Sequence, residues 1–190
     1  GGYKNKDFSP RIWDLTSGKQ LAVMKGHEKT VVGIKVLENG RLLSWSEGNR
    51  EKENSVRMWD AETGEELLHF KGHSGYFSAV EVVGDGRFVS WGSDSLKVWD
   101  METGKRLVER KGYILGFAGQ IIEEGRLLSW RGDRLQIWDS QTGKEVATLT
   151  GHQSPIKGVR ILENGNILSW GNDGFRLWDG KTGQQLGMFT

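Results

Sequence analysis

The chain consists of short apolar runs separated by turn residues. The runs are about five to eight residues long, the usual length of a strand. They are rich in Val, Ile, Leu, Phe and Trp, as in residues 31–37, 88–91, 96–99 and 156–162. No segment keeps an apolar period of 3.6 residues over the length of a helix. The pattern therefore predicts that every element is a β-strand.

The turn residues recur in two series. Asn-Gly and Asp-Gly pairs between apolar runs are the strongest short hairpin signal, because both central residues need a positive φ. One series is Asn39-Gly40, Asp85-Gly86, Glu124-Gly125 and Asn164-Gly165. The other is Thr16-Ser17-Gly18, Thr63-Gly64, Thr103-Gly104, Thr142-Gly143 and Thr182-Gly183.

Two tryptophan series show a repeat of about forty residues. A small sheet of this length cannot bury both of its faces alone, so neighbouring repeats must supply each other's core. The Trp-Asp pairs are Trp13-Asp14, Trp59-Asp60, Trp99-Asp100, Trp138-Asp139 and Trp178-Asp179. The second series, each member following a serine, is Ser44-Trp45, Ser90-Trp91, Ser129-Trp130 and Ser169-Trp170.

Composition narrows the class of protein. The 28 glycines and 2 prolines fit many tight turns between strands. The chain has no cysteine, which excludes disulfides, thiolate metal sites and a cysteine nucleophile. The net charge of +1 gives no indication of nucleic acid as a partner. No apolar stretch has the length of a membrane span and no secretory signal heads the chain, so we expect no membrane partner and a cytoplasmic location.

The combined motif resembles the WD-repeat β-propeller family. Gly-His pairs stand at Gly26-His27, Gly72-His73 and Gly151-His152, in order with the Gly turn, the serine and Trp-Asp. The pattern Leu-Leu-Ser-Trp-Ser is similar to prokaryotic members. The resemblance implies an all-β propeller of four-stranded antiparallel blades, with four complete blades and an N-terminal half blade from a larger ring. Residues 1–25 would be the outer half of one blade, followed by four blades at 26–71, 72–111, 112–150 and 151–190.

The resemblance also implies a hydrogen-bond network that stabilises each blade. In the family this network joins the Gly-His histidine, a serine or threonine, a turn aspartate and the tryptophan of Trp-Asp. The complete sets are His73, Ser90, Asp94 and Trp99, then His152, Ser169, Asp173 and Trp178. The incomplete sets are His27, Ser44 and Trp59, then Ser129, Asp133 and Trp138.

Two repeats depart from this pattern. The third has Gly112-Tyr113 in place of Gly-His, so we expect a looser or differently filled rim there. The first has no aspartate three residues after Trp45 and carries a longer loop, residues 47–55, with Arg50, Glu51, Lys52 and Glu53. Its turn network is therefore in doubt.

The polar residues also allow a catalytic or metal-binding interpretation. His, Ser and Asp together could form a nucleophilic triad, but enzymes rarely need one active site in every forty residues. The histidines lie one per repeat, without the spacing of zinc ligands. We therefore expect no catalytic residues, no metal and no cofactor, and a chain that is not an enzyme.

The loops that vary between repeats are the candidates for binding. Aromatic and aliphatic residues flanked by polar ones suit an interface centre; these are Tyr76, Phe77, Tyr113, Leu115 and Phe117. The alternative is that the phenylalanines turn inward as core. One inner-strand position is polar in every repeat and could face a central channel, its rim or solvent: Lys35, Glu81, Gln120 and Arg160.

These features favour a scaffold for protein–protein interaction through propeller face loops. The alternative is a regulatory or sensor propeller domain of a larger prokaryotic signalling or defence protein. We expect the partner to be a protein, or another domain or segment that completes the propeller. Open ends could also allow self-association.

Overall fold

In the computed structural model, the described residues form β-strands joined by turns and loops, without a helix, which confirms the predicted all-β class. The structure describes residues 7–47, 54–75, 77–84, 86–111, 118–122 and 125–189. The chain divides into two compact units, residues 1–77 and 78–190, which are described separately below. The described residues form no helix long and apolar enough to cross a membrane.

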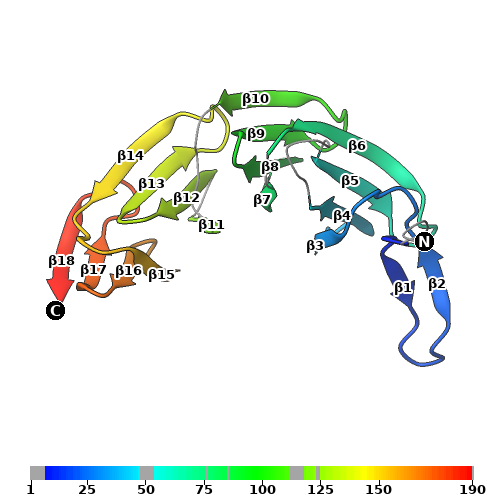
Figure 1. Cartoon of the computed structure of the whole chain (residues 1–190), viewed down its shortest axis with the longest axis horizontal. Coiled ribbons are helices and arrows are strands. Elements are labelled where there is room, and N and C mark those ends of the chain that lie inside the picture. Colours follow the sequence, from blue (N-terminus) through cyan, green and yellow to red (C-terminus); the bar gives the residue numbers. More distant parts are fainter. Residues whose placement is uncertain are drawn as a thin grey trace, which may run out of the picture. The chain divides into compact units, whose positions relative to one another are not determined.

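The first unit holds a two-stranded sheet and a four-stranded sheet (Figure 1). Met24, Leu42 and Trp59 form a buried cluster between the two sheets, and Ile12 of the first strand packs against it. The strands are β1 (Arg11–Trp13), β2 (Gln20–Val23), β3 (Val31–Val36), β4 (Arg41–Ser46), β5 (Asn54–Asp60) and β6 (Glu66–His73).

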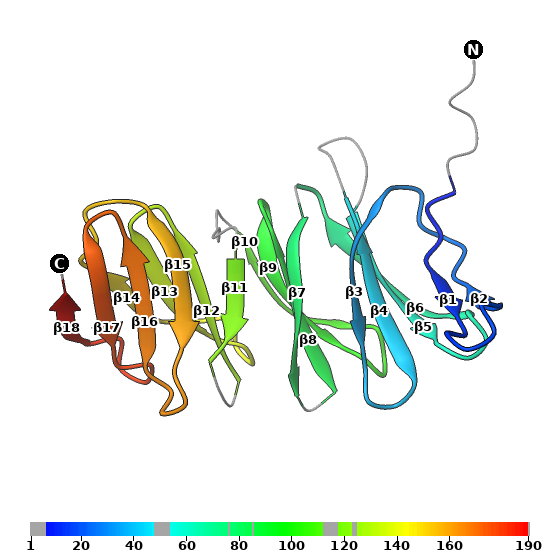
Figure 2. The same cartoon turned by 90° about the horizontal axis from the view of Figure 1, so that it is seen from below.

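The second unit holds three four-stranded sheets, whose strands follow one another in chain order. Neighbouring strands run antiparallel, as Figure 2 shows for the last sheet. The first sheet is β7 (Phe77–Gly84), β8 (Arg87–Gly92), β9 (Ser95–Asp100) and β10 (Arg106–Lys111). The second is β11 (Ala118–Ile121), β12 (Arg126–Arg131), β13 (Arg134–Asp139) and β14 (Glu145–Thr150). The third is β15 (Ile156–Ile161), β16 (Ile167–Gly171), β17 (Gly174–Trp178) and β18 (Gln185–Phe189).

Neighbouring sheets of the second unit share their cores. Val89 and Val98 of the first sheet pack with Leu127 and Trp138 of the second. On the other face of the second sheet, Leu135, Ile137 and Leu149 pack with Ile167 and Trp178 of the third. This is the stacking that the repeat pattern requires, because each sheet buries its faces only against the next one.

The residue ranges of the predicted repeats can be compared with the bounds of these sheets. The range 1–25 contains β1 and β2, and each of the four later ranges contains most of one four-stranded sheet. The last strand of the first such sheet, β6, runs two residues past position 71 to His73. The exact repeat boundaries stay a prediction.

Candidate functional site

One side-chain hydrogen bond recurs in all four four-stranded sheets. The indole Nε1 of the third-strand tryptophan donates to the hydroxyl of the second-strand serine. Both residues are buried, so the indole N–H needs a protein acceptor. The bonds are Trp59–Ser44 at 2.7 Å, Trp99–Ser90 at 2.7 Å, Trp138–Ser129 at 2.9 Å and Trp178–Ser169 at 2.8 Å.

The sheet β15–β18 extends this bond into a longer chain. His152 Nε2 lies 2.7 Å from Ser169 Oγ, and His152 Nδ1 lies 2.8 Å from Asp173 Oδ1. The Asp173 carboxylate also accepts from the backbone N–H of Gln153 at 2.8 Å and from Arg176 at 3.0 Å. One carboxylate therefore ties the segment before β15 to the turn between β16 and β17.

These contacts fix the roles of the groups. Hydrogen bonds from the Gln153 backbone and from His152 hold the pKa of Asp173 well below its usual value, so the carboxylate is charged and only accepts. His152 must then donate from Nδ1, and its Nε2 accepts the proton of Ser169. Ser169 in turn accepts from the indole of Trp178. Trp178, Ser169 and His152 are thus each partnered, whereas Arg176 Nε and Nη1 are buried without a partner among the described residues.

The sheet β3–β6 has the same chain without its carboxylate. His27 Nε2 lies 2.6 Å from Ser44 Oγ, but His27 Nδ1 is buried and has no partner among the described residues. Residues 48–53 of the longer loop, including Arg50, Glu51, Lys52 and Glu53, lie outside the described residues. Burial, together with the charge of Arg57 and with His69, lowers the pKa of His27 to about 4.

The remaining predicted network residues belong to the second and third repeats. His73 is buried in the first unit, while Ser90, Asp94 and Trp99 belong to the second. The Asp94 carboxylate accepts from Ser95 at 2.9 Å and from Lys97 at 3.0 Å. Asp133 is exposed and makes no hydrogen bond with the described part of the chain, and Tyr113, at the histidine position of that repeat, is outside it.

A polar side chain that the sequence reasoning missed lies beside each serine. The residue two before each tryptophan of Trp-Asp pairs across the strands with that serine: Arg57 with Ser44, Lys97 with Ser90, Gln136 with Ser129 and Arg176 with Ser169. Lys97 is fully buried, and its ammonium lies 3.0 Å from Asp94 and 3.3 Å from Glu109. The signal was present, because a polar residue precedes every tryptophan of this series by two positions.

Of the predicted partner-binding residues, the structure describes only Phe77. Its ring lies edge-on to that of His73, with centroids 5.0 Å apart, and it is half-buried. This position is intermediate between a free interface residue and a core residue. Tyr76, Tyr113, Leu115 and Phe117 lie outside the described residues.

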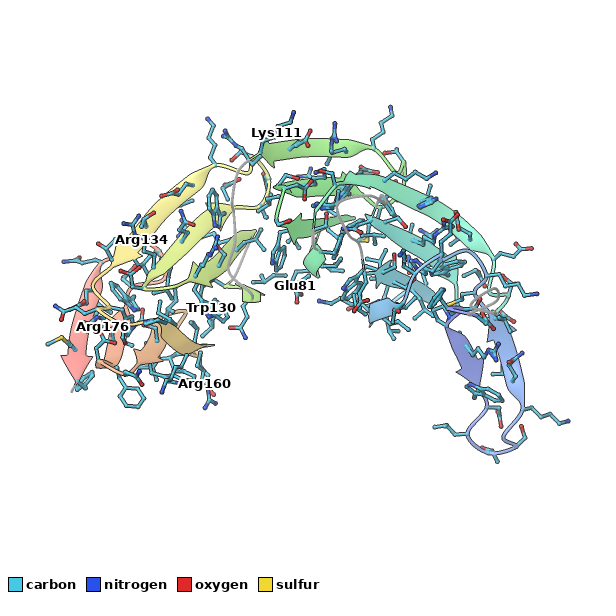
Figure 3. All side chains as sticks on the ribbon, in the orientation of Figure 1. Glu81, Lys111, Trp130, Arg134, Arg160 and Arg176 are labelled. Atoms are coloured by element: carbon cyan, nitrogen blue, oxygen red, sulfur yellow. The ribbon has the colours of Figure 1, made fainter. Side chains whose placement is uncertain are left out.

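The polar position of the inner strands lines a shared hollow in the second unit. Glu81, Gln120 and Arg160 surround it together with apolar residues of β11 and β15. Figure 3 shows Glu81 and Arg160 at the inner strands and Lys111 at an outer strand of the same unit. Its lining carries charged side chains of both signs, so the hollow is partly polar.

The geometry bears on the catalytic alternative. A nucleophilic serine must reach a substrate, whereas the hydroxyls of Ser44, Ser90 and Ser169 belong to residues with 0% exposure and accept from an indole. The described residues contain no group of three or more His, Cys, Asp or Glu side chains that could hold a metal ion. The arrangement supports structural hydrogen bonding.

Comparison with known proteins points to one family. The family model "WD domain, G-beta repeat" (WD40) matches residues 143–179. No curated protein sequence matches the chain.

Two solved structures share the architecture. The crystal structure of the computationally designed Ika8 protein superposes with a TM-score of 0.77 at 27% identity, over 96% of this chain and 56% of that chain. The crystal structure of the WD40 beta propeller domain of Doa1 gives 0.65 at 19% identity, over 96% of this chain and 62% of that chain. The chain thus spans less than two thirds of either structure. The family match identifies a WD40 repeat at residues 143–179, and the superpositions show that the chain has the fold of the WD40 β-propellers.

Proposed function

We propose that the chain is a non-catalytic scaffold that binds a protein partner through loops on one face of the propeller. WD-repeat propellers are typically interaction scaffolds and generally lack catalytic activity. The observation that carries the proposal is the serine–tryptophan bond, which is the same in all four four-stranded sheets. A hydrogen bond that is repeated in every four-stranded sheet stabilises the common framework. Partner specificity must therefore come from the residues that differ between the sheets.

The parts that differ are the segments leading into the first strand of each sheet. Glu28 and Thr30 precede β3 and are exposed, as are Gln153 and Pro155 before β15. The sequences of the corresponding segments share no side-chain pattern beyond the Gly-His pair. Variable exposed loops on a constant framework are where binding residues concentrate.

A second kind of partner is a segment that completes the first unit. On β3, Val32, Ile34 and Val36 are 47%, 50% and 75% exposed. The equivalents of the last two on β15, Val159 and Ile161, pack against the neighbouring sheet. We propose that further strands, from a partner or from another segment of the same protein, cover this part of β3.

The scaffold proposal is tested by affinity capture with cross-linking, using the Tyr76→Ala/Tyr113→Ala variant. We expect the double variant to lose the cross-linked partner while its urea unfolding midpoint stays unchanged, because the proposal assigns these side chains to the interface. Lys105→Ala, which removes an exposed turn residue, is the matched control and should retain the partner. Unchanged capture by the tyrosine variant would contradict the assignment of the face loops.

A further inference from the structure

A pocket in the first unit is lined by more cations than carboxylates. It lies on the face of the sheet β3–β6 that carries Trp59, and its lining includes the cations Lys29, Arg57 and Lys71 and one carboxylate, Glu28. Two serines from β4 and β5, Ser46 and Ser55, and His69 of β6 complete the lining. The two serines are 3% and 8% exposed. Hydroxyls and cations facing one hollow are groups that recognise an anion.

Buried polar atoms at this place lack partners. Arg57 Nε, His69 Nε2 and the nearby His27 Nδ1 are buried, and none has a hydrogen-bond partner among the described residues. Arg57 pairs with Glu66 through its Nη1, which leaves Nε unused. Arg176 Nε and Nη1 are also buried without a partner among the described residues, although Arg176 pairs with Asp173, so the guanidinium alone does not indicate a missing acceptor. The informative atom is His27 Nδ1, because buried N–H groups are nearly always hydrogen-bonded in native proteins.

The sheet β15–β18 shows what that acceptor is elsewhere in the molecule. There the Asp173 carboxylate bridges His152 Nδ1, the Gln153 backbone N–H and Arg176. By register and by the Gly-His motif, the equivalent donors in the sheet β3–β6 are His27 Nδ1, the Glu28 backbone N–H and Arg57. The donors are thus kept in the first unit. Glu66 meets Arg57 there, but no described residue supplies a carboxylate to His27 Nδ1.

The charge of the lining indicates a monoanion. Arg57 is already paired with Glu66, and Glu28 offsets one of the two lysines, so one positive charge is left over. His69 adds no charge at neutral pH, because burial and the neighbouring Arg57 lower its pKa. A single carboxylate balances this excess, and its planar pair of oxygens suits both the guanidinium fork and an imidazole N–H.

We propose that this pocket binds a carboxylate group of a ligand, held by Arg57, the hydroxyls of Ser46 and Ser55, and the imidazole N–H of His27. The proposed site includes neither Tyr76 nor Tyr113, and it goes beyond the scaffold proposal. Either can fail while the other holds, since their tests use different variants and different readouts.

The test is a titration with sodium acetate, at constant ionic strength against sodium chloride and at pH 7, followed in the imidazole ¹H–¹⁵N NMR spectrum. We expect saturable shifts of the His27 and His69 resonances. The resonance of His152 should stay still, because Asp173 already occupies the equivalent place. Failure of acetate to shift His27 or His69 would overturn the proposal.

Variants separate the site from a general charge effect. Arg57→Gln should weaken acetate binding about tenfold, the usual effect of losing one charge-assisted hydrogen bond. The sheet β11–β14 already carries Gln136 at this register position, so glutamine suits the blade. Lys71→Gln should also weaken acetate binding, and it provides a second test if Arg57→Gln does not fold. Lys25→Gln, an exposed lysine outside the pocket lining, is the matched control and should bind like the wild type.

Two further measurements test the chemical identity of the anion and whether the chain itself supplies it. Inorganic phosphate should bind more weakly than acetate, and tighter binding of phosphate would overturn the carboxylate assignment. The Glu51→Gln/Glu53→Gln variant should bind acetate like the wild type. A response to acetate that arises only in this variant would mean that the chain supplies its own carboxylate, and the proposal of an external ligand would then fail.

Discussion

Ser169 is the centre of a hydrogen-bond chain that joins four side chains. Its hydroxyl accepts from Trp178 and lies 2.7 Å from His152 Nε2, and the residue has 0% exposure. Ser129 has the same tryptophan bond, but the described residues bring no histidine to it. The two serines therefore differ in how many buried groups depend on them.

This difference predicts unequal costs of removing the hydroxyl. Ser169→Ala leaves two buried groups without a partner, so we expect it to lower the free energy of unfolding by about 2–4 kcal/mol. Ser129→Ala leaves one and should cost about 1–2 kcal/mol. Urea unfolding followed by tryptophan fluorescence measures both. Equal losses would mean that the bond to His152 adds nothing to stability.

His27 makes the stability of the first unit depend on pH. Its pKa falls from 6.5 in the unfolded chain to about 4 in the folded protein, chiefly because it is buried. Between these values the unfolded state binds more protons, so stability is lost as the pH falls from 6.5 toward 4. The contribution has a slope of up to about 1.4 kcal/mol per pH unit.

The His27→Gln variant isolates this contribution. Glutamine keeps a hydrogen-bonding side chain but does not titrate, so the loss of unfolding free energy between pH 6.5 and 4 should be smaller than in the wild type. Urea unfolding at half-unit pH steps gives both curves. Parallel curves over this range would show that other groups cause the pH dependence.

Hairpin turns dock successive sheets onto one another. The turn between β17 and β18 places Gly183 against β14, where an added Cβ would lie 2.7 Å from Ala147 Cβ. Gly64 approaches Ala22 of β2 in the first unit in the same way, at 3.2 Å. These glycines have positive φ, 75° in both cases, so they combine a turn conformation with a close contact between sheets. The Trp-Asp carboxylate caps the same turns, as Asp179 does by accepting from the Thr182 backbone at 2.7 Å.

The contact can be measured by comparing two glycines. Gly183→Ala should lower the free energy of unfolding by about 1 kcal/mol, because alanine disfavours the left-handed conformation. Overpacking against Ala147 should lower it by about 1–3 kcal/mol more. Gly132→Ala has φ 58° with nothing within 4 Å of its Cβ, so it should cost only the conformational part. The unfolding midpoints of the two variants in urea give the difference. If they agree, the turn does not carry packing between the sheets.

The outer face of the sheet β15–β18 carries exposed apolar side chains. Phe175 and Phe189 are 49% and 60% exposed. At the same register positions in the sheet β11–β14, Leu135 and Leu149 are 0% and 1% exposed, because the sheet β15–β18 covers them. The outer face of the last sheet thus carries apolar residues at positions that are buried in the sheet before it. Exposed apolar surface of this kind favours association.

We therefore expect the 190-residue chain to self-associate in a concentration-dependent manner. Phe175→Lys/Phe189→Lys should lower the weight-average mass measured by sedimentation, because a charge on this face opposes its burial. Leu107→Lys changes a residue of β10 with 47% exposure and is the control. An equal effect of the control would show that general solubility, and not this face, sets the association.

The amino-acid sequence was sufficient to predict the repeating sheets. The Trp-Asp and Ser-Trp series fix the strand phase, since a shift of one residue would turn every buried side chain to the opposite face. The serine–tryptophan pairs were predicted from the resemblance to the WD-repeat family, whose hydrogen-bond network includes both residues. Local periodicity and turn chemistry act within about forty residues, so a single chain displays them directly.

Contacts across the strands could not be read from the chain. Nothing in the sequence order shows that Arg57 lies opposite Ser44, that Lys97 is fully buried between two carboxylates, or that the donors around His27 lack the acceptor that Asp173 provides in another sheet. Pairing register and burial depend on residues that are distant in sequence, and the balance of charges at a site exists only once folding brings those residues together.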